Sequence, residues 1–381
     1  MSPLTTIGKQ NGEPAKEAAV GRLIPFTKAA LEHIEPAFDE TVTMTAATQV
    51  IGPFDVPAYG FLRGLYIKVI ASGSNDAGPN ADFAADGPWN VIQEVSLRDV
   101  NGGPLVGPFT GYDLFLIDKW GGYDFLGDPT LSPAYTIADE TEGNFSFMLY
   151  LPVEIIARSA YGALPNMNAA ATYKVSITIN ASATVYATVP DTTLPDIRVI
   201  GHVSCWTKPS ETDPAGNPAQ TAPPFVGTTQ YWSKTTLTTA VGNNTLRLPR
   251  VGNFIRNLVL VTRDNTNARD GANVPTDLRF LLDSHEIRNE SEVLRRHIMA
   301  MAYGYAIDVV TAADWDEAIH VYPFCHDFDY KPGGELGDLY LPTAQSSRLE
   351  IVGVWLNDAG TLDVLTNDIT PAPAYVRSAG R

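Results

Sequence analysis

Two groups of histidines and cysteines are the residues of this sequence with the most potential for metal chemistry. His202 lies three residues before Cys205, and His320 precedes Cys325 and His326. A structural zinc ion needs four such ligands that converge tetrahedrally. The first pair lies in a segment that we predict to be a strand, where a three-residue offset points two side chains to opposite faces. We therefore expect no metal site, and favour buried structural cysteines and ordinary loop histidines.

Two polar loops hold the oxygen ligands that calcium prefers. Neither loop has the full register of an EF-hand or its terminal glutamate. Exposed loops of an acidic protein carry such residues in any case, so a calcium site is the less favoured interpretation. The residues are Asp76, Asn80 and Asp82 in one loop, and Asp264, Asn267 and Asp270 in the other.

Paired carboxylates are the remaining candidates for chemistry. Asp327 and Asp329 are near neighbours, whereas Glu94 and Glu350 lie in different halves of the chain. Glycoside hydrolysis needs two carboxyl groups about 5 Å or about 6.5–9.5 Å apart, and the sequence shows no such pair. The Gly-rich phosphate loops, the serine nucleophile motif and the zinc-protease motif are all absent. We therefore expect no enzyme activity and no cofactor.

The overall composition excludes several classes of protein. The 381 residues carry a net charge of -17, with 44% hydrophobic and only 18% charged residues. Such a chain is too apolar to be disordered, and its charged fraction is below the roughly 25% of an ordinary soluble protein. Contacts with other copies of the same chain would explain a surface so poor in charge. An acidic chain is also a poor nucleic-acid binder.

Targeting and redox signals are weak. Met1–Gly12 has no apolar core of a signal peptide, and Val50–Ile70 is interrupted by charges and prolines, which argues against a membrane span. Cys205 and Cys325 are too few for a disulfide framework, and the sequence leaves open whether they form one bridge. This cysteine usage is typical of a chain that folds in a reducing cytoplasm.

Positive charge is concentrated at the two ends of the chain. Residues 1–28 and 371–381 each carry a net +2, so that the body between them carries -21. For two charges at each end, chance is an equally good explanation. The basic residues are Lys9, Lys16, Arg22 and Lys28 at the N-terminus, and Arg377 and Arg381 at the C-terminus.

The N-terminal segment Pro14–Ile34 is predicted to be helical. Pro14 suits a first helical position, and apolar residues recur at approximately helical spacing. Pro25 is expected to kink this helix and Pro36 to end it.

The rest of the chain has the pattern of many short strands. Between Tyr173 and Ile179 apolar residues alternate with polar ones, and clusters of Gly, Pro, Asn and Asp separate further candidates. Such a pattern predicts an all-β sandwich or barrel. The other strand candidates are Val91–Asp99, Phe145–Val153, Ile197–Thr207, Leu258–Thr262, Ile319–Phe324 and Leu349–Leu356.

Two short helices interrupt the strands at matching places of an internal repeat. Thr110 with Asp113, and Asn289 with Glu292, have the spacing of a helix cap. Six landmarks recur in the same order in both halves, which indicates two copies of one β fold. They are a Phe-x-Arg-x-Leu strand (Phe61, Phe254), a strand ending in Asp (Asp99, Asp283), the capped helix, a strand with a proline (Pro152, Pro323), a Leu-Pro loop (Leu164, Leu341) and an apolar strand (Tyr173, Leu349). The proline-rich segment Lys208–Pro224 separates the copies.

With these features the chain resembles the double jelly-roll major capsid proteins of tectiviruses, which are tailless bacteriophages with an internal membrane. The resemblance is closest in the first half. It rests on Phe54-Asp-Val followed by Gly60–Val69, on Phe145–Pro152, and on Gly162-Ala-Leu-Pro-Asn-Met-Asn leading into the strand Tyr173–Ile179.

The resemblance implies an all-β fold of two tandem eight-stranded jelly rolls with an N-terminal helical arm and short helices in loops. We expect residues 1–37 to form the arm, 38–207 the first jelly roll, 208–228 a linker, 229–371 the second jelly roll and 372–381 a tail. It also implies a homotrimer that forms a pseudo-hexagonal block in an icosahedral virion shell over an internal lipid membrane. Such a protein is assembled in the host cytoplasm and contacts neighbouring trimers, penton or vertex proteins and minor capsid proteins.

In this family the arm lies on the inner side of the shell, near the membrane. We therefore expect the basic ends to face anionic lipid, and the long loops Ser72–Gly87, Lys208–Pro224 and Asp264–Pro275 to project outward. Two other functions remain open. One is a carbohydrate-binding or glycoside-cleaving double β-sandwich, and the other is a minor vertex or receptor-binding protein of the same particle.

Overall fold

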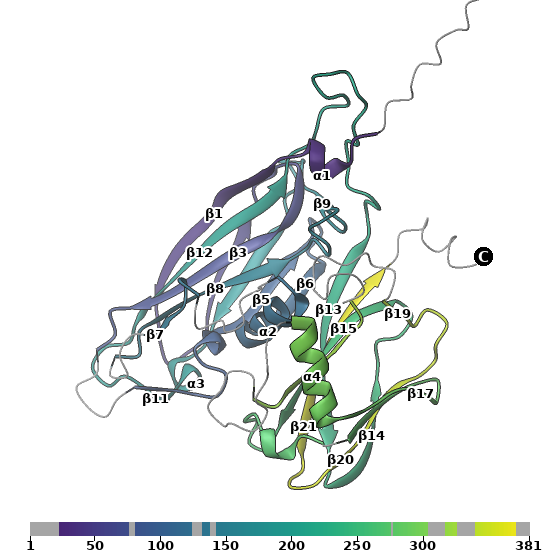
Figure 1. Cartoon of the computed structure of the whole chain (residues 1–381). Coiled ribbons are helices and arrows are strands. Elements are labelled where there is room, and N and C mark those ends of the chain that lie inside the picture. The colour runs from purple at the N-terminus through teal and green to yellow at the C-terminus, as the bar shows by residue number, and fades with distance from the viewer. Residues whose placement is uncertain are drawn as a thin grey trace, which may run out of the picture.

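The structure is a computed structural model that describes residues 23–75, 81–123, 132–137, 142–275, 277–303, 317–325 and 340–370. Its first half is a sandwich of two antiparallel sheets, which we call the first roll (Figure 1). One sheet runs in the order β1 (Glu32–Thr43), β12 (Asp196–Trp206), β3 (Phe61–Ser72), β8 (Phe145–Pro152) and β7 (Thr136–Ile137), with β9 (Leu164–Pro165) paired to β3. The other runs in the order β2 (Gln49–Asp55), β10 (Lys174–Ile179), β5 (Ile92–Arg98) and β6 (Pro104–Phe109). A small sheet pairs β4 (Asp82–Phe83) with β11 (Tyr186–Thr188).

The second half, which we call the second roll, has the same topology. One sheet runs in the order β13 (Thr229–Thr239), β21 (Gly360–Thr370), β15 (Phe254–Arg263) and β18 (Ile319–Pro323), with β19 (Leu341–Pro342) paired to β15. The other runs in the order β14 (Gly242–Leu248), β20 (Leu349–Trp355), β16 (Asp277–Leu282) and β17 (His285–Ser291). Among the described residues, each roll thus contains eight long strands in the Greek-key order of a jelly roll. The predicted fold class is confirmed.

The two rolls share even an irregularity of their hydrogen bonding. The register between β3 and β12 passes from Gly64 to Leu62 and skips Arg63, and the register between β15 and β21 passes from Asn257 to Ile255 and skips Arg256. Both arginines therefore occupy a β-bulge, which re-aims a side chain relative to the regular pleat. The shared bulge fixes the alignment of the two rolls residue by residue, in agreement with the repeat in the sequence.

The helices agree with the sequence in part. Thr110 caps the helix α2 (Gly111–Gly121) through the predicted capping box with Asp113. The helix α4 (Glu292–Tyr303) is also present, but Asn289 lies in β17, and the Leu294 amide donates instead to Ser291 Oγ at 3.4 Å. The other helical elements in the described part of the chain are α1 (Phe26–Ala29), η1 (Trp89–Val91), α3 (Ser182–Val185) and η3 (Gly271–Asn273).

The predicted helix over Pro14–Ile34 is wrong in its described part. Only the single turn α1 is helical, and β1 begins at Glu32 and runs through Pro36. Pairing with β12 along its length outweighs the weak helical spacing, and a bulge between Pro36 and Phe38 accommodates the proline. Residues 14–22 lie outside the described residues.

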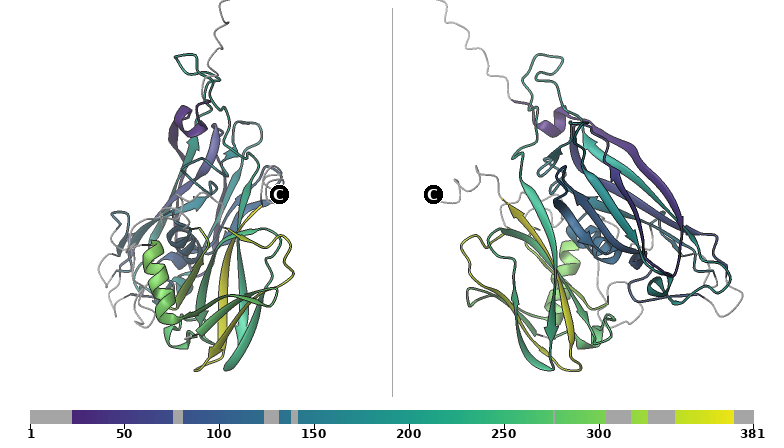
Figure 2. Two further views of the ribbon diagram at one scale, coloured as in Figure 1. Left: turned by 45° about the vertical axis from the view of Figure 1, so that its right-hand side comes forward. Right: turned by 180° about the vertical axis from the view of Figure 1, so that it is seen from behind.

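The two rolls lie side by side, with α2 between them and α4 packed on β17 and β18 of the second roll (Figures 1 and 2). One cluster of buried apolar side chains contains residues of both rolls, from Leu65 and Leu116 to Val259 and Leu365. A second cluster, around Phe280 and Trp355, fills the second roll. The first roll and the inter-roll contact therefore share one continuous core.

The described parts of the three long loops lie at two different ends of the molecule. The Ile24 amide donates to the Pro218 carbonyl at 2.9 Å, so Lys208–Pro224 lies beside α1 at the top of Figure 1. The described parts of the other two loops meet at the opposite end, where Arg269 Nε donates to Asp86 Oδ1 at 3.1 Å. Which of these loops project outward from a shell stays a prediction.

Candidate functional site

The helix α2 is the centre of the contact between the two rolls. All of its residues are buried, from Gly111 to Gly121. A helix that is buried on every side needs both ends satisfied within the protein. The capping box of Thr110 and Asp113 serves the first turn, and Gly122, in the left-handed conformation with φ 83°, ends the helix.

Side chains of the second roll bind the C-terminal carbonyls of α2. The Gly121 carbonyl accepts a hydrogen bond from Arg256 NH2 at 2.8 Å. The Trp120 carbonyl accepts from Asn257 Nδ2 at 2.9 Å and from the Tyr303 hydroxyl at 2.8 Å. A positive guanidinium at the C-terminus of a helix also interacts favourably with the helix dipole. The bulge at Arg256 thus aims that side chain at the first roll.

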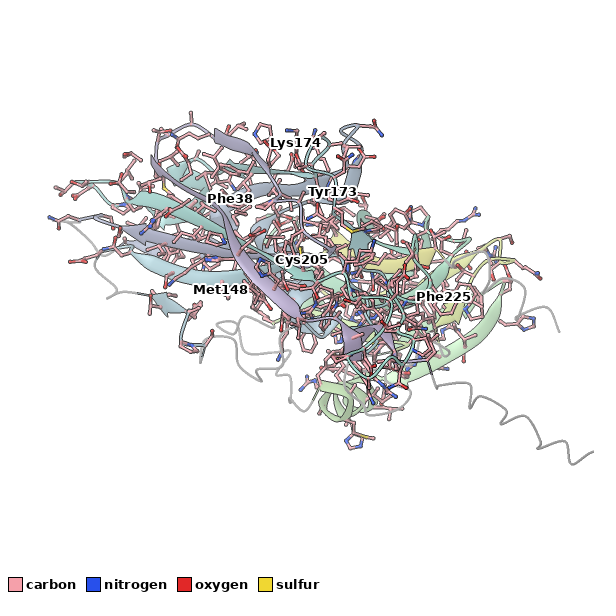
Figure 3. All side chains as sticks on the ribbon, turned by 90° about the horizontal axis from the view of Figure 1, so that it is seen from above. Phe38, Met148, Tyr173, Lys174, Cys205 and Phe225 are labelled. Atoms are coloured by element: carbon pink, nitrogen blue, oxygen red, sulfur yellow. The ribbon has the colours of Figure 1, made fainter. Side chains whose placement is uncertain are left out.

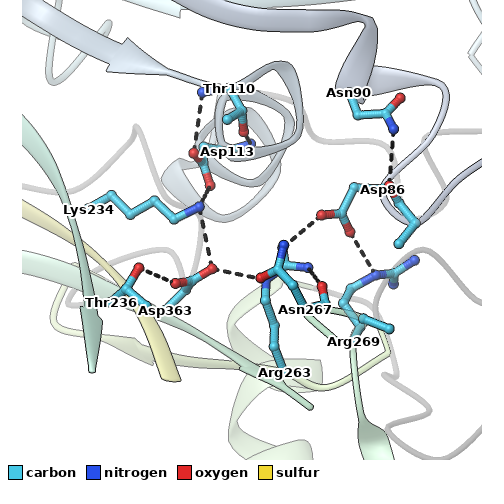
Figure 4. Close-up of polar contacts among 12 residues, drawn as sticks. Asp86, Asn90, Thr110, Asp113, Lys234, Thr236, Arg263, Asn267, Arg269 and Asp363 are labelled. Atoms are coloured by element: carbon cyan, nitrogen blue, oxygen red, sulfur yellow. Dashed lines mark hydrogen bonds and ion pairs between the residues drawn. The ribbon is translucent and has the colours of Figure 1, made fainter. Parts of the chain in front are cut away.

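A cluster of ion pairs joins the two rolls at the other end of α2 (Figure 4). Lys234 Nζ lies 2.9 Å from Asp113 Oδ1 and 3.3 Å from Asp363 Oδ2. Arg263 lies 2.9 Å from Asp363 and 2.8 Å from Asp86. Arg269 contacts Asp86 at 3.1 Å, so three acids face three bases.

The charges of this inter-roll cluster compensate one another. Burial alone would raise the pKa of Asp363, but Lys234, Thr236 and Arg263 outweigh burial and lower it. Burial would likewise lower the pKa of Lys234, but Asp113 and Asp363 raise it. Both groups therefore stay ionised near neutral pH, and neither is poised to act as a general acid or base.

A cavity of about 340 Å³ opens beside this cluster and is lined by Asp86, Tyr112, Lys234, Arg263 and Asp363 among others. Its charged side chains are bound to one another. Burial raises the pKa of the Tyr112 hydroxyl far above its ordinary value, so it is no nucleophile. The arrangement is suited to fixing the angle between two rolls, and not to chemistry on a substrate.

The equivalent arginine of the first roll makes a separate cluster near α1. Arg63 Nε lies 2.8 Å from Glu154, its guanidinium also contacts Glu32, and its Cζ lies 4.3 Å from the centre of the Trp206 ring. Glu154 is 3% exposed and accepts from Trp206 Nε1 at 2.6 Å. Burial raises the pKa of Glu154, against the opposing effect of Arg63.

The predicted metal-binding groups do not form a site in the described residues. His202 and Cys205 both lie on β12, and Cys205 is fully buried with its pKa raised by burial to about 11. His320 lies in β18 and Cys325 just after it, whereas His326 lies outside the described residues. The two cysteines are both buried and form no disulfide with each other. Across the described ranges, no group of three or more His, Cys, Asp and Glu residues is placed to hold a metal ion.

The oxygen ligands considered for calcium are used locally where they are described. Asp264 Oδ1 accepts from the Thr266 and Ala268 amides, and Asp270 Oδ1 accepts from the Ala272 and Asn273 amides. The Asn267 carbonyl accepts from Arg263 NH1. Asp82 lies in β4, and Asp76 and Asn80 lie outside the described residues.

The paired carboxylates are not brought together. Glu94 lies in the first roll, 3.8 Å from Arg98, and Glu350 lies in the second roll, 3.2 Å from Arg348. Asp327 and Asp329 lie outside the described residues.

Of the six basic end residues, only Lys28 is described. It is exposed on α1, which is anchored to the first roll by Phe26 through edge contacts with Phe61 at 5.3 Å and Trp206 at 6.4 Å. Lys9, Lys16, Arg22, Arg377 and Arg381 lie outside the described residues. Among the helices described, none is both long and apolar enough to cross a membrane.

The sequence did not identify the inter-roll residues as a site. The available signal was the presence of Arg263 and Asp363 close to runs of apolar strand residues, Leu258–Val261 in β15 and Leu362 with Val364 and Leu365 in β21. Charged residues are almost never fully buried unless they are paired, so such positions indicate a partner elsewhere in the chain.

One buried histidine makes stability dependent on pH. His320 is 1% exposed, and neither ring nitrogen has a hydrogen-bond partner within the described part of the chain. Burial, together with the charges of Arg295 and Arg296, lowers its pKa well below 6.5. The unfolded chain takes up a proton below about pH 6.5 while the folded chain does not, so acidification favours unfolding.

We expect His320→Leu to remove this dependence. Between pH 6.5 and 5 the unfolding constant of the unchanged protein should rise relative to the variant by up to about tenfold per pH unit. Urea unfolding at each pH measures the difference, with His285→Leu at an exposed strand position as the matched control. Parallel pH profiles of the protein and His320→Leu would contradict the prediction.

Comparison with known proteins shows where this architecture occurs. No family model and no curated protein matches the sequence. The crystal structure of the STIV MCP matches with a TM-score of 0.61 at 13% identity, over 92% of this chain and 100% of that one. The major capsid protein P2 from Bacteriophage PM2 matches with a TM-score of 0.52 at 12% identity, over 90% and 98%. The quasi-atomic model of the PBCV-1 virus capsid matches with a TM-score of 0.52 at 8% identity, over 89% and 93%.

These identities are low, so the matches speak for the fold alone. They extend over nearly the whole of each chain and include both rolls. The chain therefore has the double jelly-roll fold of these viral major capsid proteins.

Proposed function

We propose that the protein is the major capsid protein of an icosahedral virus, a structural protein and not an enzyme, located in the virion shell. The observation that supports this most is the match of both rolls to viral capsid proteins over at least 89% of the chain. The site between the rolls supports it too, because its buried ion pairs hold two sandwiches as one rigid block. A shell is built from such blocks and needs no reactive group in them.

We further propose that three copies form a homotrimer of six rolls, which then tiles the shell through contacts with neighbouring trimers and with vertex and minor proteins. The low fraction of charged residues supports extensive contact between copies. In this trimer, each copy would contribute one arm, first roll, linker, second roll and tail, with the boundaries expected from the sequence.

The oligomeric state tests this proposal. Size-exclusion chromatography with light scattering should give three times the 41.2 kDa mass of one chain. A monomer would contradict the proposed trimer. A monomer that also hydrolyses polysaccharide would favour the carbohydrate-active alternative, and a low copy number per virion would favour a minor vertex protein.

The end of the molecule that holds α1 is proposed to face an internal membrane. Lys28 is exposed there, and β21 runs in the direction of that end, stopping at Thr370 at the upper end of the second roll, below α1 (Figure 1). Both basic ends would then leave the body toward one surface, where each basic residue adds about 1 kcal/mol of attraction to anionic lipid.

Vesicle flotation tests the orientation. The whole chain should float with phosphatidylserine vesicles at low salt, whereas a chain without residues 1–28 should float much less. Neutral vesicles are the control. Equal weak binding of both chains would contradict a membrane-facing arm.

A further inference from the structure

The helix α4 carries an apolar face that the described part of the chain leaves uncovered. Val293 is 78% exposed, Leu294 45% and Met301 53%, and the exposed His297 lies between them on the same side of the helix. We call Val293, Leu294, His297 and Met301 the α4 face. Its opposite side, with Met299 and Ala302, is buried.

The internal repeat shows what the equivalent residues of α2 contact. Ser291 and Thr110 each accept a hydrogen bond from the amide three residues later, so the two caps align the helices. By this alignment Val293, Leu294 and Met301 correspond to Tyr112, Asp113 and Trp120. Those three residues of α2 contact the second roll: Tyr112 faces Arg263 and Arg269, Asp113 pairs with Lys234, and Trp120 packs on Tyr303. The exposed positions of α4 are thus those at which α2 is bound.

The surface that α2 contacts also has an uncovered equivalent. It is the outer face of the sheet β13-β21-β15-β18, and in the first roll the same face belongs to β1-β12-β3-β8. The strand registers give the equivalent residues. Trp232, Lys234, Arg263, Ile319 and Asp363 correspond to Ile34, Pro36, Ile70, Met148 and Ile200. We call the latter five residues the first-roll face.

Residues of the first-roll face are exposed where the equivalent residues of the second roll are buried. Ile34 is 50% exposed and Met148 46%, whereas Trp232 is 5% exposed and Ile319 is fully buried. Figure 3 shows Met148 and Lys174 on opposite sides of the first roll, with Phe38 between them, so Met148 lies on the outside of its sheet.

At the positions where ion pairs hold the closed contact, both open faces carry apolar residues. Within the chain, Asp113 of α2 pairs with Lys234 of the second roll, which also pairs with Asp363. At the equivalent positions the α4 face has Leu294, and the first-roll face has Pro36 and Ile200. Arg263 is likewise replaced by Ile70 and Tyr112 by Val293. At the positions of the inter-roll cluster the charges are lost on both faces together, so these positions match each other and not their own counterparts. The first-roll side also carries Lys68 and His202, where the second roll has Val261 and Leu365.

We infer that the α4 face docks on the first-roll face of a second copy of this chain, in the way that α2 docks on the second roll within one chain. The two faces are different surfaces of one molecule, so the contact is heterologous and forms a ring when its rotation closes. Three copies would place six rolls in one ring with a helix at every joint. The inference rests on the proposed trimer and names the surfaces that hold it.

The substitution Leu294→Asp tests the α4 face. It buries an unpaired carboxylate at the contact, so the concentration at which the trimer half-dissociates should rise at least about tenfold in analytical ultracentrifugation. Val50→Asp, at a 70% exposed position on β2, is the matched control and should leave that concentration unchanged. Far-UV circular dichroism of each variant reports whether the monomer is folded.

A rescue variant tests the pairing of the two faces. Leu294→Asp combined with Pro36→Lys rebuilds between copies the pair that Asp113 and Lys234 form within one chain. The double variant should recover most of the lost affinity, and Pro36→Lys alone should not strengthen the trimer. A stable trimer with Leu294→Asp, or a loss that Pro36→Lys fails to reverse, overturns the inference and leaves the proposed function intact. An unchanged protein that stays monomeric overturns both.

Discussion

Replacing Arg263 by methionine is expected to lower the free energy of unfolding by about 3 kcal/mol. Arg263 is 3% exposed and bridges Asp86 of the first roll and Asp363 of the second. Methionine keeps much of the side-chain volume but removes one of three positive charges, so one negative charge of the cluster is left uncompensated. Breaking a buried ion pair in this way costs about 3–5 kcal/mol, and we expect the low end because Lys234 and Arg269 remain.

The comparison variant is Arg198→Met. Arg198 also pairs with an aspartate, Asp39, but both side chains are about half exposed, at 50% and 49%. Exposed pairs contribute little to stability because water screens them, so this variant should unfold almost as the unchanged protein does. Chemical denaturation at one fixed protein concentration measures both. If Arg263→Met cost no more than Arg198→Met, the inter-roll cluster would not contribute to stability.

The repeated architecture could be predicted from the sequence because its signals are local. The Phe-x-Arg-x-Leu strands, the Leu-Pro loops and the alternating strand Lys174–Ile179 each report their own structure without reference to distant residues. The capping box of Thr110 and Asp113 has the same property, since the partners are three residues apart. Their order along the chain was sufficient to identify two jelly rolls.

The errors arose where distant parts of the chain decide the outcome. The segment around Ile34 has apolar residues at nearly helical spacing, but pairing with β12, more than 150 residues later, makes it a strand. Ser291 and not Asn289 caps α4, because β17 extends to Ser291 through its pairing with β16. A one-dimensional pattern does not contain either contact.

The site between the rolls was missed for the same reason. Asp86, Lys234, Arg263 and Asp363 come from four separate segments, and each is ordinary in its own. Composition did not distinguish the two helices either. The segment of α2 carries Asp113, Asp118 and Lys119 on different sides and is nevertheless buried throughout, whereas α4 also carries charges and has an exposed face.

Replacing Trp120 by alanine is the second substitution with a large expected effect. Trp120 is fully buried at the end of α2, in the cluster that contains Leu116 of the first roll and Val259 of the second, and its ring centre lies 4.9 Å from that of Tyr303. Removing a buried indole leaves a cavity and typically costs about 3–5 kcal/mol. Trp120→Phe should cost less, because it keeps an aromatic ring in the same place.

Leu356→Ala, at a 68% exposed position, is the control and should change the free energy of unfolding by less than about 0.5 kcal/mol. Hydrogen exchange shows whether Trp120 stabilises both rolls or only the first. Because its cluster is shared, amides of both β8 and β15 should exchange faster in Trp120→Ala than in the unchanged protein. Faster exchange in the first roll alone would mean that the rolls are stabilised independently, and α2 would then be a helix of one roll and not the joint between two.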